Sequence, residues 1–185
     1  MPEYAAFLRG MNVGGHRITN DDLRVRFEEL GCGEVRTFRA SGNVIFAVAW
    51  EEREGELSAR IETGLAAALG YEVPVFLRDA DELGTIAAER PFAAALVEAS
   101  KGKPQVVLLT AAPAARARKK VLALANDEDR LAFGERELHW LPSGGILDSA
   151  LDFKAIGRLL GPLTTRTKGT IEQLAAKYFA DRPNG

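Results

Sequence analysis

Residues 35–48, with the sequence VRTFRASGNVIFAV, set the first expectation of the fold. Two runs rich in β-branched and aromatic residues, 35–40 and 43–48, flank the dipeptide Ser41-Gly42, and this spacing predicts a tight β-hairpin. An isolated two-stranded hairpin is marginally stable in water. The flanking sequence must therefore supply the elements that cover it.

Strand and helix patterns alternate on both sides of this hairpin. Upstream, residues 3–9 form a short apolar run that predicts a strand, and residues 21–30 place apolar side chains at helical spacing. Downstream, residues 57–69 predict a second helix with one apolar face, and residues 73–78 predict another strand. The resulting order, βαββαβ, predicts an α+β fold with a ferredoxin-like unit over residues 1–79.

A similar series follows over residues 80–185. The predicted elements are strands at 105–110, 130–133 and 137–141 and helices at 81–90, 114–125, 150–160 and 170–180. After the first of these helices, the order resembles that of the first half but lacks its last strand. We therefore expect a related βαββα unit followed by a C-terminal helix, either as a separate domain or as part of one compact globule.

Composition and charge limit the possible functions. The chain has 185 residues and a net charge of −2, so it has no overall attraction for nucleic acid or an anionic membrane. Its single cysteine, Cys32, cannot build a disulfide framework. The chain opens without a signal-peptide pattern, and no apolar run reaches the length that spans a bilayer. We therefore expect a cytoplasmic protein that does not enter a membrane.

Two polar loops are expected to meet at one edge of the first sheet. In a βαββαβ unit the first two strands are parallel and the third lies between them, so the loop 10–17 and the turn 40–43 emerge at the same end. The first helix begins there, and helix N-termini with glycine-rich approaches favour anions. The candidate ligand-binding residues are Arg9, Gly10, Asn12, Gly14, Gly15, His16, Arg17, Arg39, Ser41 and Asn43.

The same residues also have a purely structural interpretation. Glycine and asparagine favour turns with positive φ, and Asp21 and Asp22 could satisfy the helix dipole without a ligand. The glycine spacing matches neither a dinucleotide fingerprint nor a P-loop, so no cofactor is predicted. With two histidines and one cysteine, the sequence also shows no metal-ligand spacing and no catalytic triad.

Three classes of function remain open. The first is binding of a small anionic or phosphate-containing ligand at this edge, and the second is an enzyme acting there with His16 as proton carrier. The third is a nucleic-acid or protein interaction module, in which strand aromatics stack bases and a basic helix contacts phosphates. The residues concerned are Phe7, Phe38, Phe46 and Phe76, and Arg116, Arg118, Lys119 and Lys120. Alternatively, the phenylalanines are buried in the core and the basic residues form an ordinary solvated helix face.

Three sequence blocks resemble the signature of a widespread bacterial family of unknown function. They are LRGMNVGG at residues 8–15, SGNVIF at 41–46 and TTRTKGT at 164–170. The resemblance implies an α+β fold with ferredoxin-like halves and no established activity. It also adds Arg166 as a candidate that completes the anion site, although neighbouring threonines could instead cap the last helix. This chain has Thr167 and Lys168 where the family typically has Asn and Trp.

Overall fold

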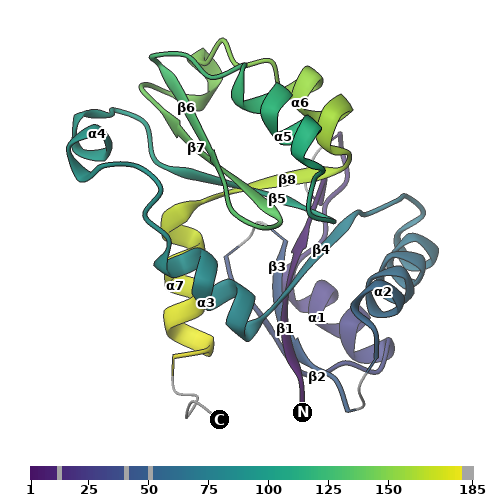
Figure 1. The fold of residues 1–185 in the computed structure, drawn as a ribbon. Helices are drawn as coiled ribbons and strands as arrows, with labels where there is room; N and C mark the ends of the chain where they lie inside the picture. The colour runs from purple at the N-terminus through teal and green to yellow at the C-terminus, as the bar shows by residue number, and fades with distance from the viewer. Residues whose placement is uncertain (12–13, 40–41, 50–51, 181–185) are drawn as a thin grey trace. The chain divides into compact units, whose positions relative to one another are not determined.

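The computed structural model describes residues 1–11, 14–39, 42–49 and 52–180. The chain forms two compact units (Figure 1). The first contains Met1–Leu83 and the segment from Lys177 onward, and the second contains Gly84–Ala176. The boundaries between the units fall within the residue ranges of helices α3 (Ala80–Ala88) and α7 (Lys168–Tyr178).

The first unit has the predicted ferredoxin-like order. Its elements are β1 (Glu3–Leu8), α1 (Asn20–Glu29), β2 (Gly33–Thr37), β3 (Asn43–Ala47), α2 (Glu54–Leu69) and β4 (Val75–Asp79). The sheet order is β2-β3-β1-β4 with antiparallel neighbours, so β1 and β2 are parallel and β3 lies between them. The α+β fold predicted from the sequence is confirmed.

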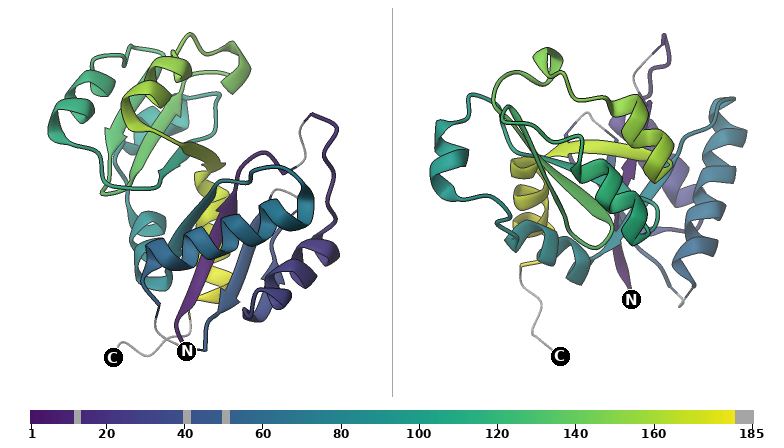
Figure 2. Two further views of the ribbon diagram at one scale, coloured as in Figure 1. Left: turned by 90° about the vertical axis from the view of Figure 1, so that its right-hand side faces the viewer. Right: turned by 45° about the horizontal axis from the view of Figure 1, so that its top comes forward.

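One face of this sheet carries both helices (Figure 2). Leu57, Ile61 and Leu65 are buried along α2, which ends at Gly70 in a left-handed conformation. Phe27 of α1 packs against Phe46 of β3, with ring centroids 5.3 Å apart. The apolar spacing that predicted two helices therefore forms the core between the helices and the sheet.

The four phenylalanines predicted on the strands of this unit do not share one face. Phe7 pairs with Phe76 across β1 and β4, whereas Phe46 pairs with Tyr4 and faces the helices. Phe7, Phe46 and Phe76 are each no more than 1% exposed. Phe38 follows the end of β2 and is half-buried. Three of the four side chains are therefore core residues and offer no surface on which bases could stack.

The second unit repeats this topology completely. Its elements are α4 (Ala94–Ala99), β5 (Gln105–Leu109), α5 (Ala115–Leu122), β6 (Asp129–Phe133), β7 (Glu137–Pro142), a 3₁₀ turn (Ile146–Asp148), α6 (Phe153–Leu160) and β8 (Leu163–Thr167). The sheet order is β6-β7-β5-β8, and α5 and α6 lie side by side over it (Figure 2).

The expectation that the second series lacks its last strand was wrong, because β8 supplies it. Leu163–Thr167 is rich in threonine and pairs with β5 at the edge of the described sheet. It lacks the apolar run that identifies β4, the equivalent edge strand of the first unit. Thr164 and Thr165 are strand residues and do not cap the last helix. Thr167 does act as a cap, because its Oγ1 accepts a hydrogen bond from the backbone N–H of Thr170 at 3.2 Å.

Candidate functional site

The loop after β1 and the β2–β3 turn lie against each other in the first unit. The backbone N–H of Leu8 donates to the carbonyl of Gly42 at 2.8 Å. Gly42 has φ +69°, and a Cβ at this position would lie 3.1 Å from side-chain atoms of both Leu8 and Met11. Glycine is thus required at this turn for both its conformation and its size. The two sequence blocks are adjacent, as their order in the sheet predicts.

Two arginines on this loop differ from five other arginines of the first unit. Arg9 and Arg17 are exposed, and neither guanidinium forms an ion pair within the described part of the chain. The arginines that do pair with a nearby carboxylate are Arg24, Arg26, Arg36, Arg53 and Arg60. Arg39 is also exposed, adopts φ +60° and lies over the Phe38 ring at 5.5 Å.

The remaining predicted residues have structural contacts of their own. Gly10, Gly14 and Gly15 all have positive φ, as the structural interpretation expects. The exposed His16 ring stacks on Tyr71, with centroids 3.8 Å apart. Asn43 is buried, and its amide donates to the carbonyl of Phe38 at 2.9 Å across the hairpin. The predicted site residues Asn12 and Ser41 lie outside the described residues.

Side chains at the start of α1 cap the helix and compensate the positive end of its dipole. Thr19 caps the helix, and its Oγ1 accepts from the backbone N–H of Asp22 at 3.1 Å. The Thr19 hydroxyl in turn donates to the Asp22 carboxylate at 2.6 Å. With Asp21 also in the first turn, the positive end of the helix dipole already faces two acids. The structural interpretation therefore accounts for this part of the predicted anion site.

Arg166 lies on β8, opposite Val106 of β5. Its Nη1 donates to the Thr164 hydroxyl at 2.9 Å and to the carbonyl of Thr165 at 3.0 Å. Burial lowers the pKa of the Arg166 guanidinium to about 10, so it keeps its charge at neutral pH. Arg166 belongs to the second unit and the Gly10 loop to the first, so a joint role for them stays a prediction.

The second unit contains a cavity that the sequence did not indicate. Its volume is about 230 Å³, and it is lined by residues of the second unit alone. The apolar part of the lining comes from Pro91, Phe92, Val97 and Pro104. The polar part comes from Gln105, Gly169 and five ionisable side chains, Glu89, Arg90, His139, Lys168 and Glu172. Arg90 and Glu172 form an ion pair with an N–O distance of 3.2 Å.

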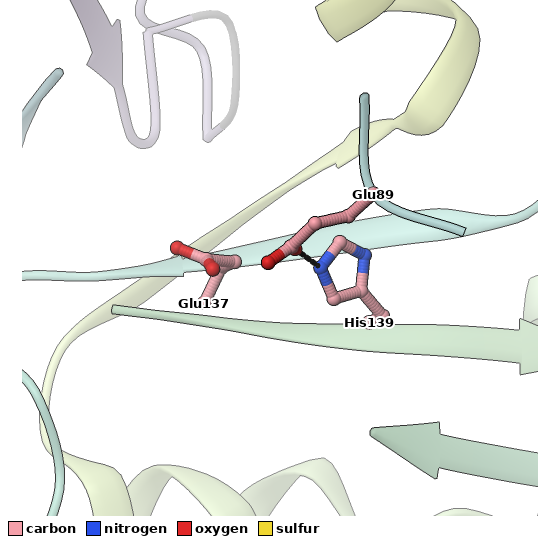
Figure 3. Close-up of side chains that lie close together, drawn as sticks. All are labelled: Glu89, Glu137 and His139. Atoms are coloured by element: carbon pink, nitrogen blue, oxygen red, sulfur yellow. Dashed lines mark hydrogen bonds and ion pairs between the residues drawn. The ribbon is translucent and has the colours of Figure 1, made fainter. Parts of the chain in front are cut away.

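Three potential metal ligands converge beside this cavity (Figure 3). His139 Nε2 lies 2.5 Å from Glu89 Oε2, and one ligand atom each of Glu89, Glu137 and His139 lie within 4.8 Å of one another. Glu137 and His139 are two positions apart on β7, so they project from the same face of the sheet. Glu89 follows the end of α3.

Backbone contacts hold two members of this cluster. The Glu137 carboxylate accepts from the backbone N–H of Glu135 at 2.9 Å and from that of Arg136 at 3.2 Å. Lys168 Nζ donates to the carbonyl of Glu89 at 2.9 Å and also to that of Ile86, which fixes the chain at the end of α3. Burial lowers the pKa of the Lys168 ammonium.

Sequence reasoning missed this cluster, although one signal was present. The alternation Glu137-Leu138-His139 in a predicted strand places the acid and the imidazole on one face. The contribution of Glu89 had no local signal, because it joins the cluster from 50 positions away.

Comparison with known families fits this topology. A family model described as "Protein of unknown function (DUF1697)" matches residues 1–139. The chain belongs to this family. The part that matches the DUF1697 model contains the Gly10 loop, the Gly42 turn, Glu89, Glu137 and His139, whereas the block around Arg166 lies beyond it. No curated protein matches the chain.

A solved structure supports the fold of this DUF1697 member. It is described as that of the conserved bacterial protein SP0830 from Streptococcus pneumoniae. The likeness has a TM-score of 0.71 at 20% sequence identity, and it covers 96% of this chain and 99% of the other. At this identity the comparison shows a shared fold alone. Within the described residues, every helix is too short or too polar to cross a membrane.

Proposed function

We propose that this protein binds a small anionic ligand, such as a phosphate-containing metabolite, where the loop after β1 meets the β2–β3 turn. The observation that carries the proposal is the pair of exposed arginines, Arg9 and Arg17, which form no ion pair within the described residues. A guanidinium is a strong donor to phosphate and carboxylate groups. Arg39, on the adjacent turn, supplies a further positive charge.

The neighbouring contacts support this location. The Leu8–Gly42 hydrogen bond joins the end of β1 to the β2–β3 turn, which supports a site that draws on both segments. Gly14 and Gly15 leave open space around their Cα atoms, which lets a ligand approach the backbone closely. The His16 ring, stacked on Tyr71, offers a further polar group beside the arginines.

A ligand screen with matched variants tests the proposal. The panel contains inorganic phosphate, nucleotides, sugar phosphates and small carboxylates, and the readout is the thermal unfolding midpoint followed by calorimetric titration. A ligand present at 100 times its Kd should raise the free energy of unfolding by about 2.7 kcal/mol. The double variant Arg9→Gln/Arg17→Gln should lose this gain.

The control variant is Arg53→Gln, which removes an exposed arginine of the first unit that pairs with Glu56. This control removes one positive charge, whereas the double variant removes two, and its site lies outside the two loops. It should therefore bind the ligand like the unmodified protein. The proposal fails if no compound in the panel stabilises the protein. It also fails if the control and the double variant weaken binding equally, because binding would then follow net charge.

The other two functional classes receive less support. The nucleic-acid module relied on exposed strand aromatics, and Phe7, Phe46 and Phe76 are buried. An enzyme at this edge with His16 as proton carrier stays a prediction. We also propose a cytoplasmic location, because Cys32, the single cysteine, is a free and buried thiol.

A further inference from the structure

We propose that Glu89, Glu137 and His139 form a binding site for a divalent transition-metal ion that opens onto the cavity of the second unit. This inference is independent of the anion site proposed above, since it concerns other residues in the other unit. It rests on three donor groups of suitable chemistry, on their convergence, and on the cavity that two of them line.

The donor set is suited to ions of intermediate hardness. One imidazole nitrogen and two carboxylate oxygens are ligands that Zn²⁺, Mn²⁺ and Fe²⁺ accept, whereas Ca²⁺ and Mg²⁺ prefer oxygen ligands alone. The chain has two histidines, and His139 is the one that lies beside acidic side chains. The site therefore favours a transition-metal ion over an alkaline-earth ion.

The cluster contains more ligand groups than an ion pair between Glu89 and His139 would need. His139 and Glu89 alone would satisfy each other, with their N–O distance of 2.5 Å. Glu137, a residue only 4% exposed, adds a second carboxylate, one oxygen of which lies within 4.8 Å of the ligand atoms of Glu89 and His139 (Figure 3). Two backbone N–H donors orient this carboxylate, as is common for metal ligands.

The cavity gives the proposed ion a route to solvent and to a second ligand. Glu89 and His139 belong both to the cluster and to the cavity wall. Three protein ligands leave coordination positions open, which is typical of catalytic sites, whereas structural zinc sites are usually closed by four. The apolar wall, with Phe92 and Val97, suits a small molecule that has an apolar body and an anionic group able to reach the metal.

Metal titration of the full chain without an affinity tag tests the site. Protein treated with a chelator is titrated with ZnCl₂ by calorimetry and with CoCl₂ by visible absorption, which reports on the coordination of Co²⁺. We expect one ion per chain. Glu89→Gln and His139→Gln should each weaken Zn²⁺ binding at least tenfold and abolish the Co²⁺ spectrum.

Two control variants separate this site from adventitious binding. Glu172→Gln removes a carboxylate from the same cavity wall but outside the cluster, and His16→Ala removes the other histidine. Both should bind Zn²⁺ like the unmodified protein. Circular dichroism establishes that each variant is folded. Should His139→Gln not fold, Glu89→Gln still decides the matter, since the Glu89 side chain is one-third exposed and glutamine has the same size and can still hydrogen-bond to His139.

Several outcomes overturn the proposal. They are the absence of Zn²⁺ and Co²⁺ binding at millimolar concentration, binding that survives Glu89→Gln unchanged, and binding that is lost in His16→Ala. The last two results would show adventitious binding at another surface.

Discussion

Glu89 Oε2 lies 2.5 Å from Nε2 of His139, although the two residues are 50 positions apart in the sequence. The His139 side chain is 3% exposed and the Glu89 side chain 34%, so the contact joins a core strand to the surface of the second unit. It anchors the segment after α3 to β7. The contact therefore has a structural effect in the metal-free protein.

Removing either partner should destabilise the metal-free protein. Glu89→Ala leaves the buried His139 without its hydrogen bond, and His139→Ala also opens space in the sheet. We expect each change to lower the free energy of unfolding by about 1–3 kcal/mol. Urea denaturation with chelator present measures the loss. In a double-mutant cycle the double variant should lose less than the sum of the single losses, and simple additivity would contradict the contact.

Gly42 should tolerate no side chain. In Gly42→Ala the new Cβ meets Leu8 and Met11 at 3.1 Å, and the residue must also keep φ +69°. We expect a loss of about 1–3 kcal/mol in thermal or urea unfolding. Gly14→Ala is the matched control, because it has a similar φ of +63° but open space around it. A Gly42→Ala variant no less stable than Gly14→Ala would show that the close approach is unimportant.

Cys32 should react slowly with alkylating agents in the folded protein. Burial raises the pKa of its thiol to about 11, so about one molecule in a thousand holds the reactive thiolate at pH 8. Iodoacetamide labelling followed by mass spectrometry should be slow in buffer and fast in urea. Rapid labelling of folded protein at pH 8 would contradict this burial.

The same thiol should make stability depend on pH at the alkaline end. The folded state holds this proton more tightly than the unfolded chain, whose cysteine pKa is about 9. Its contribution is therefore complete below pH 9 and is lost as the pH rises to about 11, at about 1.4 kcal/mol for each pH unit. Urea denaturation across this range should show a smaller slope for Cys32→Ala. Equal slopes would exclude this contribution.

Lys168 should be needed to fix the end of α3. Lys168→Met keeps much of the apolar stem but removes the ammonium that donates to the carbonyls of Ile86 and Glu89. We expect a loss of about 1–3 kcal/mol in the free energy of unfolding. Lys119→Met, at an exposed position of α5, is the control and should change stability little. Equal stability of the two variants would show that these hydrogen bonds contribute nothing.

Much of the first unit could be predicted because its signals are local. The apolar stripe of α2 and the presence of a hairpin are encoded within a few residues, and strand order then follows from handedness. The predicted two-residue turn was too short, because β2 ends at Thr37 and β3 begins at Asn43. β8 escaped prediction because it lacks an apolar run like that of β4, the equivalent edge strand, and its polar residues, such as Thr165 and Arg166, resemble a loop. The proximity of the loop after β1 to the β2–β3 turn could be predicted from the strand order. The Glu89–His139 contact could not, because it depends on where α3 ends relative to β7.

The repeated strand order places Asn43 and Glu137 at equivalent positions, each opening the third strand of its sheet. Both use the side chain to close the hairpin that precedes them, but with opposite chemistry. Asn43 offers an amide donor to a carbonyl, and Glu137 offers a carboxylate acceptor to two amides. One backbone plan therefore presents a donor at this corner in the first half and an anion in the second. The repeated topology therefore fixes where a side chain closes the hairpin, but not the type of residue that does so.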